Sequence, residues 1–263
     1  MTKRSRASVF LPWIVPICLL GAWFWVCRTG IVPTYLLPAP TDIGKSAWVY
    51  LFGEVGSAPY AGRFVTDLSA STGRVSMGFV AAVVFGIPMG VVSGRVPIVR
   101  SLLGTTVNGL RSVPGISWLP LAMVWFGVGM KTTVFLVALA SFFPVYVNTA
   151  IGAGNVDFIL YQVGATMGVG RIRGVFDILL PAAMPQIMSG LRLGLGTSWA
   201  YLVLGELTGV PFGLGALIMD ARMMGRIDMI IVGIVVIAAM GRLSDLLLSS
   251  AMRFFFRSAR RMA

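Results

Sequence analysis

Apolar runs separated by short polar segments dominate the hydrophobic pattern of this chain. Each run is close to or above the roughly 20 residues that an α-helix needs to cross a bilayer. The six runs lie at 7–27, 75–94, 112–130, 132–156, 186–207 and 229–252, and the third lies within a membrane element expected to begin near residue 102. The pattern therefore predicts an all-α membrane protein, built as a bundle of six transmembrane helices.

The composition supports a membrane protein and excludes several other classes. Hydrophobic residues make up 57% of the 263 residues and charged residues only 11%, against about 25% charged in soluble domains. The net charge of +12 could indicate nucleic-acid binding, but the basic residues flank apolar runs and form no aromatic-interleaved patch. The chain has no His, so His-based catalysis and His-ligated metals are excluded. Cys18 and Cys27 form no CxxC pair and are expected to be small apolar residues.

The distribution of Lys and Arg predicts the orientation, because cytoplasmic loops of membrane proteins are enriched in them. With six spans and an inner N-terminus, the cytoplasmic side holds Lys3, Arg4, Arg6, Arg95, Arg100, Arg171, Arg173, Arg253, Arg257, Arg260 and Arg261. The opposite side holds Lys45, Arg63, Lys131, Arg222 and Arg226. This bias predicts a multi-pass membrane protein with both termini in the cytoplasm.

The same pattern divides the chain into segments. The expected order is a basic cytoplasmic N-terminus (1–8), a first transmembrane helix (9–28), an extracytoplasmic segment (29–71), a membrane core (72–255) with a cytoplasmic loop (155–185), and a basic tail (256–263). A cleaved signal peptide is the alternative for the first run. The run ends in Trp and Phe followed by Arg28, without a small-residue cleavage site, which favours an uncleaved helix.

The extracytoplasmic segment is expected to hold one short interfacial helix. Its three prolines prevent a continuous helix, and Thr41 or Asp42 could cap a helix that carries Tyr50 on its apolar face. The sequence Gly44-Lys45-Ser46 lacks the earlier glycine of a phosphate-binding loop, because Ala39 stands there. The energy source is therefore expected on another chain.

Two of the runs carry features beyond length. In 75–94 small residues recur every four positions, which predicts a face for close helix packing; they are Gly78, Ala82, Gly86, Gly90 and Gly94. The run 112–130 is broken by prolines and glycines. Non-helical backbone at membrane depth must be buried in protein or line an aqueous cavity. Pro114 and Trp118 are therefore candidate residues of a translocation pathway, and simple proline kinks are the alternative.

Charged residues inside the runs are functional candidates by default. Arg242 and Asp245 are three residues apart and can pair on one helix face, which favours a structural ion pair. Arg192 and Glu206 lie about 21 Å apart along one helix axis, too far to pair within it. Glu206, near the outer end, is a candidate for a gate or a docked partner, and an interfacial anchor is the alternative.

The loop from Tyr161 to Pro181 resembles the cytoplasmic signature loop of ABC importer permeases. In that family the loop reads Glu-Ala-Ala, three residues, Gly, nine residues, Ile-x-Leu-Pro. The second half matches at Gly168, Ile178, Leu180 and Pro181, whereas Gln162, Val163 and Gly164 replace Glu-Ala-Ala. The resemblance implies an ATPase-coupling loop that also includes Thr166, Met167 and Arg171. A turn at Gly168 would require the positive φ that glycine adopts freely.

Further stretches in 35–255 are similar to the nitrate, sulfonate and taurine subfamily. They are 37–41 (LPAPT), 74–79 (RVSMGF), 111–115 (RSVPG), 120–129, 142–144, 148–149 and 213–215. The resemblance implies a type I importer permease with three kinds of partner: a cytoplasmic ABC ATPase dimer, a second permease copy and an extracytoplasmic solute-binding protein. It also implies no cofactor on this chain, with ATP and Mg on the ATPase, a small anionic solute, and a location in the bacterial cytoplasmic (inner) membrane. The second copy is expected to be identical, with a heterodimer as the alternative.

Two other function classes are weighed against this one. A secondary transporter driven by an ion gradient should show internal repeats and acidic residues in broken helices, and the sequence has no repeat and few acidic residues in its runs. An integral-membrane enzyme would need a cluster of His, Asp or Cys at one membrane face, which is absent. The sequence therefore favours a transport subunit that is not itself an enzyme.

Overall fold

The computed structural model describes the backbone of residues 7–30 and 32–255, and the side chains of this part except those of 7–13, Arg171 and Phe255. This part is helical and holds no strand. The helices are α1 (Ala7–Thr29), α2 (Pro40–Phe52), α3 (Phe64–Arg95), α4 (Pro97–Arg111), η1 (Gly115–Ser117), α5 (Trp118–Phe126), α6 (Met130–Gly154), α7 (Phe158–Thr166), α8 (Arg171–Gly174), the π-helical turn η2 (Val175–Leu179), α9 (Leu180–Glu206), α10 (Leu214–Met223) and α11 (Ile227–Phe255).

Within the described residues, four helical segments are long and apolar enough to cross a membrane. They are Phe64–Arg95, Met130–Gly154, Ile172–Glu206 and Ile227–Phe254, and two shorter apolar helices are Ile14–Thr29 and Gly115–Phe126. The expected third span is two helices, because Pro114, which has no N–H to donate, follows the end of α4. The basic stretches 1–6 and 256–263, on which the orientation partly rests, lie outside the described residues.

The chain divides into two compact units, each described by itself. The first comprises residues up to 65 and 217–234, and the second comprises 66–216 and the residues from 235 onward. In the first unit α2 matches the expected interfacial helix, and Tyr50 is buried with its ring edge-on to Phe64. The expected cap by Thr41 or Asp42 is wrong: Pro40 occupies the first helical position after Ala39, where its fixed φ suits a helix start.

Helix α6 is the central helix of the second unit, and α3 packs on it through the predicted glycine face. A Cβ added at Gly78 would lie 2.6 Å from a Val137 methyl, and one at Gly90 would lie 2.7 Å from Cβ of Thr149. Gly94 approaches α6 as closely, with an added Cβ 2.5 Å from the Ala150 carbonyl oxygen, and Gly86 is less tight, at 3.0 Å from a Val145 methyl. The glycines therefore let two helix backbones meet inside one chain, and this face is not left free for a second copy.

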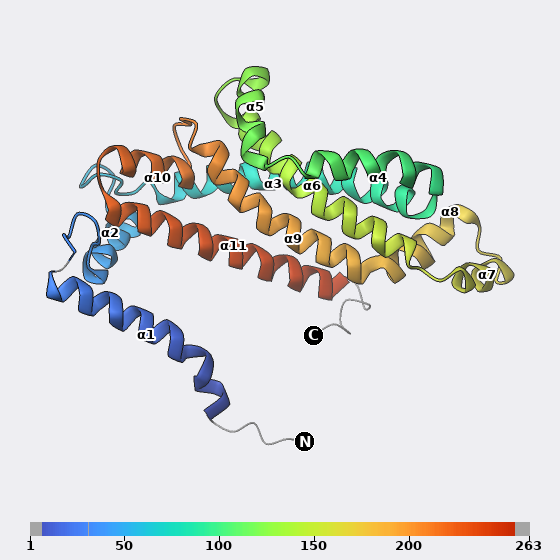
Figure 1. The fold of residues 1–263 in the computed structure, drawn as a ribbon, viewed down its shortest axis with the longest axis horizontal. Helices are drawn as coiled ribbons and strands as arrows, with labels where there is room; N and C mark the ends of the chain where they lie inside the picture. The colour runs from blue at the N-terminus through green and yellow to red at the C-terminus, as the bar shows by residue number, and fades with distance from the viewer. Residues whose placement is uncertain (1–6, 31, 256–263) are drawn as a thin grey trace. The chain divides into compact units, whose positions relative to one another are not determined.

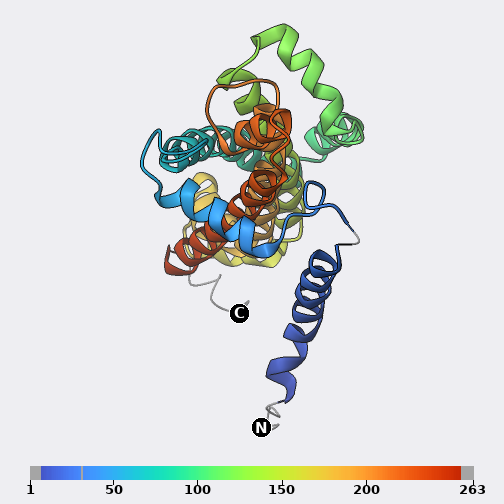
Figure 2. The same ribbon diagram turned by 90° about the vertical axis from the view of Figure 1, so that its left-hand side faces the viewer.

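Helix α9 covers another side of α6 through a second glycine stripe, and the two long helices run side by side in Figure 1. A Cβ at Gly190 would lie 2.7 Å from Cβ of Asn148, and one at Gly205 would lie 2.8 Å from the Thr133 backbone. Close to end-on, in Figure 2, these long helices of the second unit overlap as a bundle. Helices α7 and α8 lie together beyond one end of α6 and α9 (Figure 1), so the loop projects from the bundle.

Candidate functional site

The predicted coupling loop forms a short helix, α7, followed by a sharp turn. Asp157 caps the helix by accepting a hydrogen bond from the Ile159 N–H at 3.0 Å. Gly168 ends it with φ of 79°, and the Val169 N–H bonds back to the Gly164 carbonyl at 2.9 Å. Such a left-handed turn favours glycine. The expected positive φ at Gly168 is therefore confirmed.

Gly164, in the half of the motif that departs from the family pattern, is a packing position. It is buried, and a Cβ there would lie 2.4 Å from Cδ1 of Ile178. The missing side chain thus lets α7 lie against the π-helical turn that leads into α9. Leu180 and Pro181 open α9, where a proline in the first turn is accepted. A movement of α7 would reach α9 through this contact.

Tyr161 of α7 contacts the end of α3. The Arg95 guanidinium at the end of α3 lies 4.3 Å from the centre of the Tyr161 ring, a distance typical of a cation–π contact. Burial raises the pKa of Tyr161 above its ordinary value, against an opposing effect of the Arg95 charge. The ring therefore remains neutral at physiological pH, and α7 contacts both α3 and the start of α9.

The outer face of α7 is apolar and exposed. The exposed fraction is 66% for Phe158 and 78% for Met167. The neighbouring Ile159, Leu160 and Val163 are exposed as well, as are the polar Gln162 and Thr166. The side chain of Arg171 lies outside the described residues. An apolar face of this kind on a projecting helix is suited to a groove on another protein.

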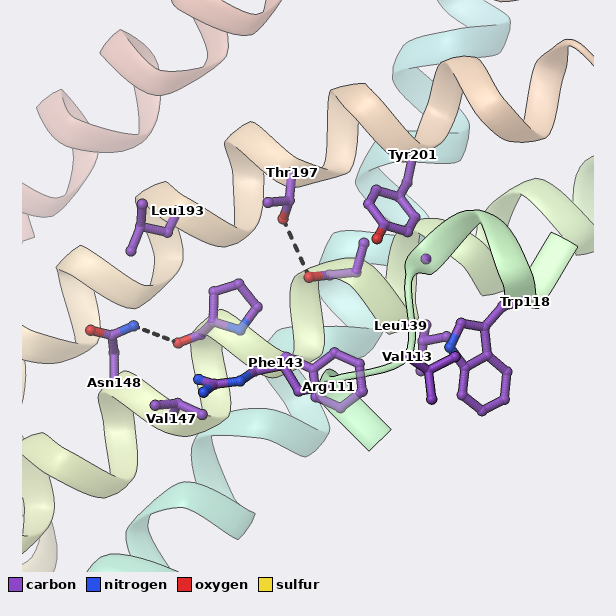
Figure 3. A pocket seen from close by; sticks show the side chains of 13 residues that line it. Arg111, Val113, Trp118, Leu139, Phe143, Val147, Asn148, Leu193, Thr197 and Tyr201 are labelled. Carbon is purple, nitrogen blue, oxygen red and sulfur yellow. Dashed lines mark hydrogen bonds between the residues drawn. The ribbon is translucent and has the colours of Figure 1, made fainter. Parts of the chain in front are cut away.

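A cavity of about 320 Å³ lies between the turn after α4 and helices α6 and α9 (Figure 3). Its lining residues are Arg111, Val113, Gly115, Trp118, Leu139, Ala140, Phe143, Pro144, Val147, Asn148, Leu193, Thr197 and Tyr201. Arg111 is the one charged residue among them. Trp118, a predicted pathway residue, lines this cavity, and Pro114 lies between two lining residues in the same turn. Glu206 does not line it.

Pro144 explains why polar groups gather on this wall. Proline has no N–H, so the Ala140 carbonyl one turn earlier cannot accept the usual helical hydrogen bond. The Thr197 hydroxyl of α9 lies 3.3 Å from that carbonyl and can donate to it, and Asn148 Nδ2 donates to the Pro144 carbonyl at 2.8 Å. Figure 3 shows both contacts as dashed lines. The Ala140 carbonyl that the proline leaves without its helical donor thus has a donor within the bundle, as membrane depth requires.

Position 115 has room only for glycine, because the Tyr201 ring fills the space that a side chain there would need. A Cβ at Gly115 would lie 1.6 Å from the Tyr201 hydroxyl oxygen, and Figure 3 shows the Tyr201 ring directed at the turn. Arg111, Gly115 and Asn148 belong to motifs that carry the family resemblance. A polar residue interrupting an apolar run was the available signal for Asn148 and Tyr201. The sequence could not show that these residues meet in one cavity.

Glu206 lies in a fully buried polar cluster at the other end of α9. It accepts hydrogen bonds from Arg74 Nη1, from the Ser71 hydroxyl at 2.8 Å and from the Gly215 N–H at 2.8 Å. Asp67 accepts from the Gly213 N–H at 3.0 Å. Three side chains of α3 and α9 therefore satisfy the N–H groups at the start of α10, which helices leave unpaired.

The predicted ion pair between Arg242 and Asp245 is present, at 3.3 Å. Arg192 of α9 adds a bidentate contact to the same carboxylate, at 2.7 and 2.9 Å, so Asp245 joins α9 to α11. Arg242 is 68% exposed. Among the described side chains no group of three or more His, Cys, Asp or Glu is placed to hold a metal ion.

Comparison with known proteins places these features in one family. Residues 82–261 match the binding-protein-dependent transport system inner membrane component family. The chain is 32% identical, over 92% of its length and 85% of the relative's, to a Bacillus subtilis (strain 168) protein named as an aliphatic sulfonates transport permease. It is 32% identical to the taurine transport system permease of Escherichia coli (strain K12), over 89% of this chain and 84% of that one.

A third relative is the nitrate import permease of Synechocystis (strain PCC 6803), 32% identical over 90% of this chain and 86% of that one. The secondary-transporter and membrane-enzyme alternatives are therefore wrong. Proteins of this family work with a separate ATPase and a solute-binding protein, and are multi-pass inner-membrane proteins. The chain belongs to the binding-protein-dependent inner-membrane components, and is a type I permease subunit of an ABC importer of the sulfonate, taurine and nitrate kind.

Proposed function

We propose that this chain carries a small anionic solute across the membrane, driven by a cytoplasmic ATPase dimer that docks on α7. The relatives' names point to aliphatic sulfonates, taurine or nitrate as the solute class. The observation that carries the coupling role is the apolar outer face of α7, which projects on a capped and packed helix. ATP and Mg²⁺ bind the partner ATPase and not this chain.

The motion is transmitted through packing. Closure of the ATPase dimer pushes α7, which contacts the π-helical turn through Gly164 and Ile178 and contacts α3 through Tyr161. Both contacts lead into long helices that border α6. A displacement of α7 therefore tilts α3 and α9 together against α6, and α6 and α9 both line the cavity.

A second, identical permease completes the pathway. In one chain the cavity is bounded by α6, α9 and the turn after α4, which is one wall of a channel. Helices α4 and α5 and the short helix η1 between them expose apolar side chains, including Leu102, Val124 and Ile116. These side chains supply the dimer contact in place of the buried glycine face. The solute-binding protein docks on the opposite side from α7, and both termini lie in the cytoplasm.

Gly168→Arg tests the coupling role. The glycine has positive φ but open space around it, with no atom within 4 Å of an added Cβ. The substitution thus strains one turn by on the order of 1–2 kcal/mol and leaves the bundle intact. We expect normal membrane levels of the variant, weak capture of the ATPase, and loss of the ATP hydrolysis that loaded binding protein stimulates in reconstituted vesicles.

Two further variants distinguish backbone strain at residue 168 from the effect of a large charged side chain. Gly168→Ala carries the same φ penalty without a long charged side chain, so it should retain most of the ATPase capture. Gly170→Ala changes a position with φ of −66° and open space, and should behave as wild type. Full stimulation of ATP hydrolysis by the Gly168→Arg protein would show that the loop is only a connection between helices.

A further inference from the structure

We propose that the Arg111 cavity is a solute-binding site within the permease itself, selective for an organic monoanion with an apolar body over inorganic nitrate. The proposal rests on the proposed transport function and narrows its solute class. The site requires three features: a single unpaired cation, free hydrogen-bond donors, and an apolar wall. Each is found in the residues that line the cavity.

The charge in the cavity is that of one guanidinium. Arg111 is the last residue of α4, and no Asp or Glu lines the cavity. No ion pair joins Arg111 to any of the described side chains. Arg111 is itself exposed and borders a cavity whose lining is mostly apolar. Its guanidinium attracts a single negative charge and can bind a sulfonate or carboxylate through two parallel hydrogen bonds. The same charge repels cations.

Three other side chains that line the cavity carry hydrogen-bond donors without an acceptor in the described part of the chain. The Tyr201 hydroxyl and the Trp118 indole N–H have no hydrogen-bond partner among the described residues, and both side chains line the cavity. Asn148 uses one amide hydrogen on the Pro144 carbonyl, which leaves its second hydrogen free. By contrast, Thr197 is engaged with the carbonyls of Ala140 and Gly194. Thr197 therefore shapes the wall, and the other three donors supply recognition.

The remaining wall is apolar. Leu139, Phe143, Val147 and Leu193 line it, and all four are labelled in Figure 3. The volume of about 320 Å³ falls at the low end of small-molecule sites, about 300–1,000 Å³. Nitrate has no apolar part to bury against such a wall, whereas an alkyl sulfonate or carboxylate does. The wall therefore favours an organic anion over an inorganic one.

Direct binding to the permease–ATPase complex in lipid nanodiscs, without binding protein, tests the site. The probes are butane-1-sulfonate, pentanoate, nitrate and n-butylammonium, measured by isothermal titration calorimetry. We expect saturable binding of the sulfonate or the carboxylate, at least tenfold weaker binding of nitrate, and none of butylammonium. The comparison of sulfonate with carboxylate identifies the headgroup.

Variants locate the binding. Arg111→Gln should weaken sulfonate binding at least tenfold, and Tyr201→Phe, which keeps the ring, by about two- to tenfold for one lost hydrogen bond. Arg222→Gln is the matched control, since Arg222 is exposed on α10 and does not line the cavity. Its affinity should match wild type. Size-exclusion profiles verify that each variant is folded.

Three outcomes would overturn the site: no saturable organic-anion binding to wild type, equal affinity for nitrate and butane-1-sulfonate, or unchanged affinity in both the Arg111 and Tyr201 variants. None of these outcomes would contradict the proposed coupling role of α7. That role is measured by stimulated ATP hydrolysis in the Gly168 series, which needs no direct affinity for solute. If the binding experiments fail while the Gly168 variants behave as expected, all solute recognition would lie in the binding protein.

Discussion

In the buried cluster around Glu206, we predict that removing the carboxylate destabilises the chain more than removing its partner Arg74. Glu206→Ala leaves the largely buried Arg74 guanidinium without its carboxylate, with the Phe212 carbonyl as its remaining hydrogen-bond acceptor in the cluster. Removing one partner of a buried ion pair costs about 3–5 kcal/mol of unfolding free energy. The substitution also removes the acceptor for the Gly215 N–H at the start of α10. We therefore expect a loss in the upper half of that range.

Arg74→Ala should cost less, about 1–3 kcal/mol. A carboxyl group left alone can take up a proton and become neutral, whereas a guanidinium cannot lose its proton. Glu206 would also keep its hydrogen bonds from Ser71 and Gly215. The double variant should be more stable than the sum of the two single losses predicts, by about 0.5–3 kcal/mol, because the two groups are in contact.

The assay is reversible unfolding of the purified chain by dodecyl sulfate in mixed micelles, followed by tryptophan fluorescence. Lys45→Ala is the control, since Lys45 is 82% exposed in its pair with Asp42, outside the candidate spans, and exposed ion pairs contribute less than about 1 kcal/mol. The reasoning is refuted if Glu206→Ala destabilises the chain no more than Lys45→Ala does. It is refuted equally if Arg74→Ala proves the more damaging of the two single changes.

Two further predictions concern the bundle. Gly90→Leu should sharply lower the yield of folded permease, because the new side chain forces α3 away from α6 at a cost of about 1–3 kcal/mol or more. Gly73→Leu on the same helix meets no atom within 4 Å at Cβ and should keep the wild-type yield. Equal yields of the two variants in a fluorescent size-exclusion assay would contradict the packing. Reporter fusions within 157–170 and at the C-terminus should read as cytoplasmic, and fusions near residue 55 as extracytoplasmic; an extracytoplasmic reading at the C-terminus would reverse the topology.

Much of the coupling loop could be predicted from the sequence, because its determinants are local. A glycine with positive φ, a capping Asp and a proline at a helix start each act within one turn of backbone. These features place Gly168 and Pro181 without knowledge of the bundle, and the cap at Asp157 is equally local, although it was not among the sequence predictions. The glycine face of α3 was equally predictable, since a repeat of four residues stays on one side of a helix.

Only the tertiary structure shows which other parts of the chain each of these elements contacts. The spacing of Gly78 and Gly90 predicts close packing with some helix, but not that α6 of the same chain is the partner. Arg74 and Glu206 are 132 positions apart, and no local pattern predicts that they pair. Arg111, Asn148 and Tyr201 come from three different helices.

The physical reason is the range of the interactions. Helix length, turns and caps follow from neighbouring residues, whereas burial, ion pairing and cavities depend on which helix faces come together. The sequence alone thus determined a helical membrane protein with a glycine-marked coupling loop. The tertiary structure alone placed a lone guanidinium in a cavity without carboxylates, and sealed Glu206 within the protein.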